Sequence, residues 1–449
     1  MSGLLVGIDV GTARVKAVAV DPRGQVCGES ERATPWRCSR GRAEVDPVAL
    51  VGLARTVATE AAGERGALAI GVTGMAETGV LVDGHDRPLA PAIAWHDPRG
   101  DVETIARELG EETFERSTGL PLTVLPSLAK LLWLRRKHPE TAAASRFYSV
   151  GEWIVRRFGG DPVAELSLAS RTGLLELSSA RPWGEAFALL GSPPLLPEPL
   201  VAGTAAGRAG GDELPETLRG ATLTVAGHDH QVAAYGVGAA TDDALFDSLG
   251  TAEALVRTVR PPVSPQQIGA LTGQGMSVGW GVGAGRLCVL AGLWTGLTLH
   301  RIAELLGATT GAQRRALGEQ ARAAPASHPT LRLTSHRDGH LSIGGITDGI
   351  TPAIVWRAAV EAMVAESGRL LDRIDALVGP HREVVVGGGW LHNPALLDAK
   401  RRQHPGMRTT TVAEPGAYGA ALLAASAAGI AVPARPPRQR EVPQHAHQP

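Results

Sequence analysis

Two stretches of the chain share one pattern of apolar and polar positions. Residues 4–10 (LLVGIDV) form an apolar run that leads into a Gly turn, and residues 14–20 (RVKAVAV) alternate as a returning strand. Residues 244–259 (ALFDSLGTAEALVRTV) repeat the shape: a strand, an Asp, a Gly-Thr turn and a returning strand. The repeat predicts an internal duplication of an α/β unit, with a boundary near residues 238–243.

Other segments of the chain are predicted to form the helices and further strands of this α/β fold. Asp46 and Pro47 precede an apolar segment with helical spacing, where they suit the N-cap and the first helical position. Residues 351–378 keep apolar residues at helical spacing over a long segment. The runs LAIGVTGM, ATLTVAGH and REVVV read as buried strands, each followed by a turn or by glycines.

The longest uncharged run, residues 415–434, approaches the length of a membrane span. It consists mostly of Ala and Gly and is bracketed by prolines, so it predicts a buried helix that packs closely on a sheet. The N-terminus has no basic leader, and Asp9 interrupts its apolar stretch. We therefore expect a soluble cytoplasmic protein that does not bind membranes, with a disordered tail at residues 434–449.

Composition narrows the class of protein. The chain has 44 Lys and Arg against 45 Asp and Glu, and a net charge near zero argues against a dedicated nucleic-acid binder. Its three cysteines cannot build a disulfide scaffold, which favours a reducing compartment.

The first Gly-Thr turn carries candidate chemistry. Backbone N–H groups of Gly11 and the hydroxyl of Thr12 can hold phosphate oxygens, and Lys16 can neutralise phosphate charge. Asp9, at the end of the strand, can hold Mg²⁺ through water. Taken alone, the motif is equally compatible with a plain hairpin.

A second turn, Gly250-Thr251, strengthens this interpretation, because two such turns can grip a polyphosphate. The triple glycine 387–389 follows a buried strand and precedes Asn393, and it would let a nucleotide approach the backbone. The alternative for the glycines is close packing of a helix on a strand.

The segment Gly227-His228-Asp229-His230 falls at a predicted strand-to-helix turn. The Asp229 carboxylate can accept a proton from a substrate hydroxyl during phosphoryl transfer, although it would also make a good helix N-cap. His228 and His230 are expected on opposite sides of an extended strand, which disfavours a zinc site.

Glu77 follows another predicted strand, and Trp95 and Asp97 lie at the end of the strand paired with it. An aromatic face with carboxylate acceptors suits a polyhydroxy ligand. The alternative is a buried Trp beside a local pair of Asp97 with Arg99 at the surface.

In their order along residues 3–432, these motifs resemble the FGGY carbohydrate kinase family of the actin/hexokinase/Hsp70-like ATPase superfamily, with an overall pattern like that of xylulokinase-like members. The matching segments are IDVGTARVKAVAVD, GVTGMAETGVLVD, WHDPR, GHDHQVAAYGVGA, SLGTAEAL and GGGWLHNPALLDAKRRQ. The resemblance implies an α/β fold of two RNase H-like domains flanking a central catalytic cleft. It implies a sugar-binding domain at residues 1–238, an ATP-binding domain at 239–433 and a tail at 434–449.

The resemblance also implies ATP-dependent phosphorylation of a sugar or polyol hydroxyl. Asp229 would be the general base and Asp9 would orient Mg²⁺. The implied nucleotide contacts are Gly11, Thr12, Lys16, Gly250, Thr251, Gly292, Gly388, Gly389 and Asn393. The implied substrate contacts are Glu77, Trp95, Asp97, Asp229 and His230. A homodimer is common among such kinases.

Departures from the family pattern bear on the acceptor. The substrate loop reads Met75-Ala76-Glu77, where xylulokinase-like members carry Met-His-Gly and glycerol kinase-like members carry Arg-Glu. A Glu without its usual basic neighbour favours a neutral polyol or ketose, because Glu77, Asp97 and Asp229 would repel a sugar acid. Other readings are a kinase of another small hydroxylated metabolite, such as a linear signalling carbonyl or a sugar acid, or a non-catalytic ATP-binding switch.

Overall fold

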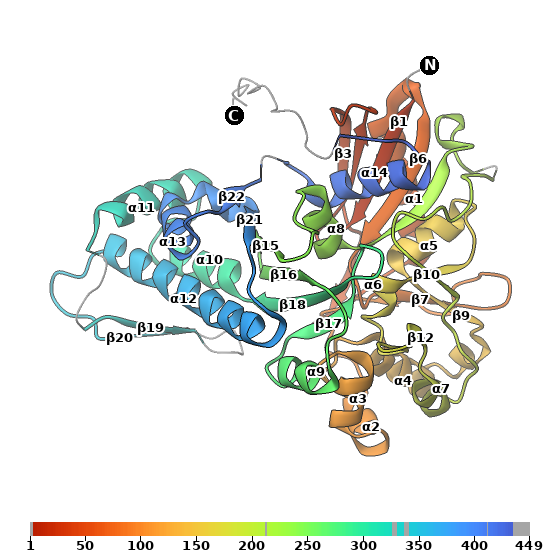
Figure 1. Ribbon diagram of the computed structural model, residues 1–449, viewed down its shortest axis with the longest axis horizontal. Helices are drawn as coiled ribbons and strands as arrows, with labels where there is room; N and C mark the ends of the chain where they lie inside the picture. The colour runs from red at the N-terminus through yellow and green to blue at the C-terminus, as the bar shows by residue number, and fades with distance from the viewer. Residues whose placement is uncertain (1–2, 212, 326–329, 336–340, 411, 434–449) are drawn as a thin grey trace. The chain divides into compact units, whose positions relative to one another are not determined.

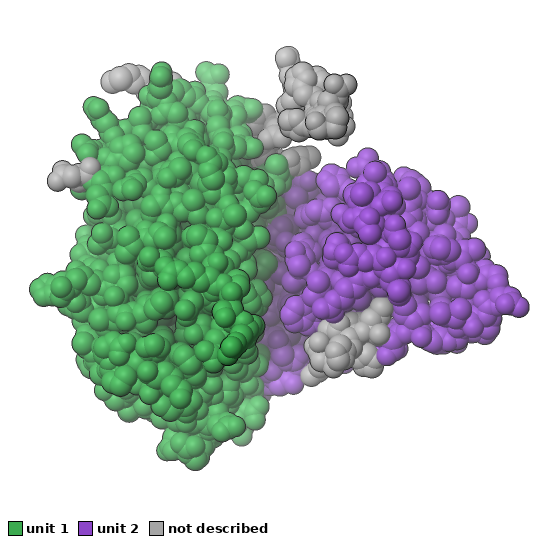
Figure 2. Space-filling view, turned by 180° about the vertical axis from the view of Figure 1, so that it is seen from behind, with its two compact units in different colours: residues 1–238, 278–287, 411–449 green, residues 239–277, 288–410 purple. Residues whose placement is uncertain are grey.

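The computed structural model describes residues 3–211, 213–325, 330–335, 341–410 and 412–433. The chain forms two compact units, the first comprising residues 1–238, 278–287 and 411–449 and the second residues 239–277 and 288–410 (Figure 2). The predicted tail at 434–449 lies outside the described residues.

Unit 1 is built on a five-stranded sheet in the order β14-β6-β1-β2-β3 (Figure 1). Its strands are β14 (Thr222–His228), β6 (Ala67–Gly74), β1 (Leu4–Val10), β2 (Arg14–Val20) and β3 (Val26–Ala33). The strands β1 and β2 form an antiparallel hairpin, whereas β6 runs parallel to β1 and β14 parallel to β6. The carboxyl ends of β1, β6 and β14 therefore share one edge of the sheet.

Unit 2 repeats this arrangement. Its strands follow in the order β18-β16-β15-β21-β22, with bounds Leu287–Leu293, Glu253–Val259, Ala244–Leu249, Glu383–Gly387 and Arg408–Thr409. Here β15 and β16 form the antiparallel hairpin, and β21 and β22 continue in parallel. The predicted internal duplication is confirmed.

Alternation along β1 explains how its two faces are covered. Leu4, Val6 and Ile8 belong to a buried cluster with helix α1 (Pro47–Ala62), while Leu5 packs with helix α14 (Pro415–Ala427). Successive side chains of a strand point to opposite faces, so one apolar strand serves both helices. The N-cap of α1 is Asp46, as predicted, and its side chain accepts a hydrogen bond from Val48 N.

Helix α14 is the predicted Ala- and Gly-rich buried helix. A Cβ added at Gly7 would lie 1.8 Å from Ala417 O, and one at Gly71 would lie 2.1 Å from Ala420 O. Only glycine allows this approach of helix to sheet. Because α14 packs on the sheet of unit 1, it groups with that unit, whereas the predicted boundaries put it in the domain at 239–433. Among the described residues, no helix has the length and apolar character needed to cross a membrane.

The remaining elements surround these sheets. In unit 1 they are α2 (Val102–Glu108), α3 (Glu111–Thr118), α4 (Ser127–Lys137), α5 (Val150–Arg157), α6 (Leu166–Ala169), α7 (Gly184–Leu190) and α8 (Asp229–Gly236), with short strands β4 (Arg37–Ser39), β5 (Arg42–Val45), β7 (Gly79–Val82), β8 (Ala92–Ile93), β9 (Arg146–Ser149), β10 (Val163–Glu165), β11 (Leu175–Glu176), β12 (Arg181–Pro182) and β13 (Glu198–Leu200). Most of β17 (Ser277–Trp280) also belongs to unit 1, where Trp280 N donates to Ser170 Oγ.

The remaining elements of unit 2 are α9 (Pro265–Thr272), α10 (Thr295–Leu305), α11 (Gly311–Ala323), α12 (Pro352–Val378) and α13 (Pro394–Gln403), with the antiparallel pair β19 (Arg332–Ser335) and β20 (Leu341–Gly344). Helix α12 is the long helix predicted over residues 351–378.

Candidate active site

Asp9 and Asp229 lie at the same edge of the unit 1 sheet. Asp9 on β1 pairs in register with Thr73 on β6, and Thr73 pairs with Gly227 on β14. Asp229 begins α8 immediately after β14. Parallel pairing through the central strand thus gathers two carboxylates that are 220 positions apart in the numbering.

The carboxyl group of Asp9 has an unusually high pKa and an oxygen without a hydrogen-bond partner among the described residues. Its pKa is raised from 3.8 to about 7: burial is the largest cause, the charges of Asp229 and Glu414 also raise the pKa, and Lys16 lowers it. Among the described residues, no donor reaches Asp9 Oδ1. A buried oxygen without a partner, beside a second carboxylate, is suited to a cation.

The Gly11-Thr12 turn is held by side chains. Thr34 Oγ1 donates to Gly11 O at 2.8 Å, and the indole N–H of Trp36 donates to Thr12 O at 2.6 Å. The indole N–H of Trp95 donates to the Thr12 hydroxyl at 2.8 Å. Trp95, predicted as a sugar contact, is therefore bonded to the predicted phosphate turn.

Lys16 lies beside this turn but is engaged by an acidic partner. Its Nζ is 2.6 Å from Glu414 Oε2, and both side chains are about 30% exposed, at 29% and 31%. Glu414 is the N-cap residue of α14. Lys16 thus already has a counter-ion, a contact that local sequence pattern did not reveal.

The strand-to-helix turn before Asp229 is tightly constrained. Gly227 has a φ of 113°, and a Cβ there would lie 2.6 Å from Ser167 Oγ. Thr73 Oγ1 donates to Gly227 O at 2.6 Å, and Ser167 Oγ accepts a hydrogen bond from His228 N at 2.9 Å. These contacts fix the backbone that presents Asp229.

Asp229 itself is the first residue of α8, and His228 is the N-cap. The Asp229 side chain is 24% exposed, and its Oδ1 accepts a hydrogen bond from His230 N at 2.7 Å. The alternative role as N-cap is therefore wrong, and the carboxylate is accessible.

The two histidines lie together instead of on opposite sides. Their rings meet edge to face, with centroids 5.6 Å apart, because His230 is already in the helix. Burial, together with the charges of Arg171 and His230, holds the pKa of His228 well below its usual value. Within the described ranges, no group of three or more His, Cys, Asp or Glu is placed to hold a metal ion.

Glu77 lacks a basic neighbour in the sequence, where Ala76 precedes it, but the structure gives it a basic partner from a distant segment. Arg171 approaches Glu77 Oε1 with Nε at 2.8 Å and Nη2 at 2.6 Å. Glu77 is buried and adopts a φ of 61°, which is uncommon for a residue other than glycine. Lys130 is also buried, and its pKa is lowered to about 8. Burial is the largest cause, and the Glu77 charge opposes it by raising the pKa.

Asp97 is fully buried, and protein donors surround its carboxylate. Oδ1 accepts from the backbone N and the Nε of Arg99, and Oδ2 accepts from Ala43 N and Arg99 Nη2. Burial raises its pKa, but the bonds from Arg99 and Ala43 outweigh burial and leave the pKa below the usual value. Asp97 and Arg99 thus form the pair that the alternative predicted, but its placement at the surface is wrong, because the Asp97 side chain is fully buried.

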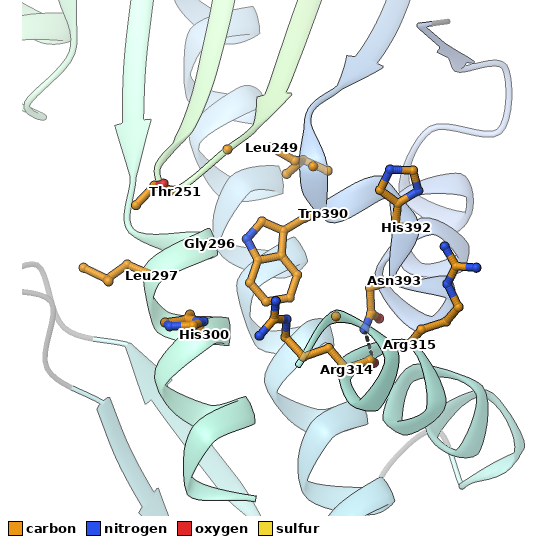
Figure 3. A pocket seen from close by; sticks show the side chains of 13 residues that line it. Leu249, Thr251, Gly296, Leu297, His300, Arg314, Arg315, Trp390, His392 and Asn393 are labelled. Atoms are coloured by element: carbon orange, nitrogen blue, oxygen red, sulfur yellow. Dashed lines mark hydrogen bonds between the residues drawn. The ribbon is translucent and has the colours of Figure 1, made fainter. Parts of the chain in front are cut away.

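Unit 2 contains a pocket of about 720 Å³ beside its own Gly-Thr turn (Figure 3). Of the predicted nucleotide contacts, Gly250, Thr251, Gly389 and Asn393 line it. The sequence did not single out the other lining residues: Leu249, Gly296, Leu297, His300, Gly311, Arg314, Arg315, Trp390 and His392. Helices contribute most of these, and their facing sides follow from tertiary packing.

Two predicted glycines differ in their surroundings. Gly388 has a φ of 104°, and a Cβ there would lie 2.3 Å from Leu249 O, so the backbone of the triple glycine passes close to β15. Gly292, on β18, has open space around it and does not line the pocket. The glycine of this region that packs closely against the Gly250-Thr251 turn is Gly296, where a Cβ would lie 2.0 Å from Gly250 O.

A buried charged cluster lies behind the Gly250-Thr251 turn. Lys400 Nζ is 2.6 Å from Asp247 Oδ2 and 2.7 Å from Glu253 Oε1, and all three side chains are fully buried. Thr295 Oγ1 donates to Glu253 Oε2, and Lys400 also donates to Ser367 Oγ at 2.8 Å. The pKa of Asp247 is raised to about 7, chiefly by burial; the Lys400 charge lowers the pKa, and the Glu253 charge raises it. The cluster ties the turn to α10, α12 and α13.

Comparison with known proteins identifies relatives of this arrangement. The model of the FGGY family of carbohydrate kinases, N-terminal domain, matches residues 4–236. A glycerol kinase of Aromatoleum aromaticum is 29% identical over 95% of this chain and 90% of its own length. A gluconokinase of Bacillus subtilis is 29% identical over 43% of this chain and 39% of its own length.

Solved structures share the fold. A gluconate kinase from Lactobacillus acidophilus superposes with a TM-score of 0.86 at 19% identity, covering 96% of this chain and 90% of its own. A xylulose kinase from Rhodospirillum rubrum gives 0.85 at 22% identity, covering 95% and 91%. The family model spans more than half of the chain, and the fold is that of two-domain, actin-like sugar kinases. The chain therefore belongs to the FGGY family of carbohydrate kinases, which phosphorylate hydroxyl groups of sugars and polyols with ATP.

Proposed function

We propose that this chain phosphorylates a neutral polyol or sugar, with Asp229 as the general base. The observation that carries the proposal is the placement of Asp9 and Asp229 at one sheet edge, close enough for the charge of Asp229 to raise the pKa of Asp9. Kinases that transfer a phosphoryl group in line commonly use one Asp to accept the proton of the acceptor hydroxyl and another to hold Mg²⁺.

In this mechanism, Asp229 accepts the proton of the acceptor hydroxyl as the oxygen attacks the γ-phosphorus. The new O–P bond forms while the bond to the β-phosphate oxygen breaks, and ADP leaves. Asp229 suits this role because its side chain is partly exposed while its turn is fixed by Gly227, Thr73 and Ser167.

Asp9 would hold Mg²⁺, which neutralises phosphate charge when it is bound. The unpaired Asp9 Oδ1 fits such an ion. With one protein carboxylate, the remaining ligands would be water and phosphate oxygens, which Mg²⁺ accepts readily.

The pocket of unit 2 would bind the nucleotide. Its lining combines the Gly250-Thr251 turn, Gly389 of the triple glycine, and two arginine side chains. Backbone N–H groups and arginines suit phosphates, and its volume of about 720 Å³ lies in the range of cofactor sites.

A neutral acceptor is supported by the glycerol kinase relative, which aligns along 95% of this chain. The predicted repulsion of sugar acids is weaker than expected, because Arg171 pairs with Glu77 and Arg99 with Asp97. An aldonate is therefore the second candidate, favoured by the Glu77–Arg171 pair.

ADP release coupled to a panel of glycerol, ketoses, gluconate and linear hydroxycarbonyls tests the function and the acceptor. Asp229→Asn should reduce stimulated turnover by a factor of about 10² or more, while ADP binding measured by calorimetry stays within about twofold. Asp161→Asn, at an exposed carboxylate of the same unit, is the matched control. Full activity of Asp229→Asn would exclude this base, and no turnover on any acceptor would favour the ATP-binding switch.

A cytoplasmic location accords with a kinase that draws on cellular ATP, and cell fractionation tests it. Light scattering at several concentrations tests the predicted homodimer.

A further inference from the structure

Trp390 provides the broadest ring surface of the unit 2 pocket. It lies in the one-turn helix η4 (Gly389–His392) that follows the triple glycine. In Figure 3 it stands between the side that carries Thr251 and His300 and the side that carries Asn393. An aromatic ring in such a position is suited to a flat ligand.

The indole of Trp390 is held in place from behind. It stacks on the fully buried Trp356 of α12, with ring centroids 6.1 Å apart and planes 30° apart. A Cβ at Gly296 would lie 2.8 Å from Trp390 Nε1, so α10 confines that edge. The remaining surface of the ring lines the pocket, and it is ordered before any ligand binds.

The side-chain amide of Asn393, in contrast, is already committed to the protein. Its Oδ1 accepts from Leu396 N at 3.3 Å and from Trp356 Nε1 at 3.4 Å, and its Nδ2 donates to Arg314 O at 2.9 Å. A Cβ at Gly318 would lie 2.9 Å from both amide atoms, which shows that the amide faces α11. Asn393 therefore caps α13 and joins it to α11.

This arrangement affects which base the pocket can accept. In the DNA major groove, a side-chain amide of Asn or Gln pairs with the edge of adenine, whereas an Arg guanidinium donates to O6 and N7 of guanine. The described lining residues include Arg314 and Arg315 but no Asp, Glu or Gln. Stacking alone tolerates every base, because each base has a π-face.

We infer that the donor base is held by stacking on Trp390, backed by Trp356, and that this kinase uses guanine nucleotides as well as adenine nucleotides. The inference rests on the proposed function in assigning the donor nucleotide to this pocket. Trp390 then determines donor affinity, and the Asn393 amide serves the architecture of the pocket.

Calorimetric titration of the full chain with Mg²⁺·ADP and Mg²⁺·GDP tests the inference without an acceptor. The wild type should bind the two within about tenfold of each other. Trp390→Ala should weaken both by about tenfold or more, the usual effect of losing a stacked aromatic ring, and Trp390→Phe should stay within about threefold. Trp294→Leu, at an exposed tryptophan of unit 2 outside the pocket lining, should bind like the wild type.

The outcomes separate this inference from the proposed function. Unchanged ADP affinity in Trp390→Ala, or a wild-type preference for ADP over GDP above about 100-fold, overturns it. If Trp390→Ala fails to fold, as judged by circular dichroism, Trp390→Leu retains apolar volume without a π-face and carries the same expectation. Nucleotide binding without turnover on any acceptor would count against the proposed function alone, and a wild type that binds neither nucleotide would overturn both.

Discussion

Individual hydrogen bonds from aromatic residues set the conformation of the Gly11-Thr12 turn. Trp36 bonds the carbonyl of Thr12, and Trp95 bonds its hydroxyl. An indole N–H has a fixed direction, so the two rings orient the turn before phosphate arrives. At the residue scale, Trp95 therefore positions the Gly11-Thr12 turn, which we predict to hold phosphate.

Replacing Trp95 with Phe keeps an aromatic ring and removes this donor. A hydrogen bond of about 1 kcal/mol corresponds to about a fivefold effect. We therefore expect the KM for ATP to rise about fivefold in Trp95→Phe, with a smaller change in the KM for the acceptor. Steady-state kinetics with each substrate varied measure both constants. A rise confined to the acceptor KM would return Trp95 to its predicted role as a sugar contact.

At the scale of elements, glycines fix the distance between α14 and the sheet of unit 1. The helix carbonyls of Ala417 and Ala420 occupy the space where side chains of Gly7 and Gly71 would be. Small residues on both surfaces let the backbones approach, so the contact tolerates no added methyl group.

Gly71→Ala should destabilise unit 1 by about 3 kcal/mol, because its Cβ would overlap a backbone carbonyl that cannot move alone. Gly52→Ala is the matched control: Gly52 lies inside α1, no atom lies within 4 Å of an added Cβ, and the change should stabilise by about 0.5–1 kcal/mol. Urea unfolding of both variants measures the difference. Equal stability of the two variants would contradict the close packing of α14.

The N-terminus of α5 depends on a buried carboxylate. Glu152 accepts from Ser149 N and from Glu165 N, each at 2.7 Å, and completes a capping box with Ser149. Its pKa is raised from 4.5 to about 8, because burial raises the pKa by more than the hydrogen bonds from Ser149 N and Glu165 N lower it. The neighbouring Glu165 also has a pKa raised by burial, to about 7.

A raised carboxyl pKa makes stability fall as pH rises. Between pH 4.5 and 8 the folded chain keeps a proton on Glu152 that the unfolded chain has lost, which contributes a slope of up to about −1.4 kcal/mol per pH unit. Glu152→Gln should remove this contribution, so its stability relative to the wild type should increase from pH 5 to pH 8. Urea unfolding at several pH values tests this, and a constant difference would show that Glu152 is ionised when folded.

At the scale of the whole molecule, each unit has its own buried lysine. Lys130 of unit 1 donates to the carbonyls of Val124 and Leu125, whereas Lys400 of unit 2 joins two carboxylates behind the Gly250-Thr251 turn. A chain with two compact units need not unfold in one step. The effects of the two lysines should therefore be separable.

Lys400→Met leaves Asp247 and Glu253 buried without their cation, and we expect unit 2 to lose about 3–5 kcal/mol. Hydrogen exchange measured by mass spectrometry should rise in β15, β16, α10 and α13, and ADP affinity should fall because Glu253 supports the Gly250-Thr251 turn. Lys130→Met should raise exchange around α4 and leave ADP affinity unchanged. Similar exchange changes in both units for either variant would contradict separate cores.

Local sequence pattern predicted much of the fold and part of the site. Alternation and turn residues predicted the strands that end near Asp9 and Asp229, and the Gly250-Thr251 turn that lines the unit 2 pocket. The long uncharged run of Ala and Gly between prolines predicted α14. These features depend on neighbours in sequence, because period and turn chemistry are local properties.

Long-range partners were decided by the tertiary structure alone. Arg171 reaches Glu77 across 94 positions, and Lys400 reaches Glu253 across 147. The indole of Trp390 is held as a wall of the pocket because α12 places Trp356 behind it, and local sequence does not show that contact. Such contacts depend on which strands pair and how helices pack. The alternation of apolar and polar residues within a single strand does not show which distant segment will lie against that strand. The sequence by itself thus determined which carboxylates and turns lie at the ends of strands. The packing of distant segments determined the charged partners of those carboxylates and the side chains that line the unit 2 pocket.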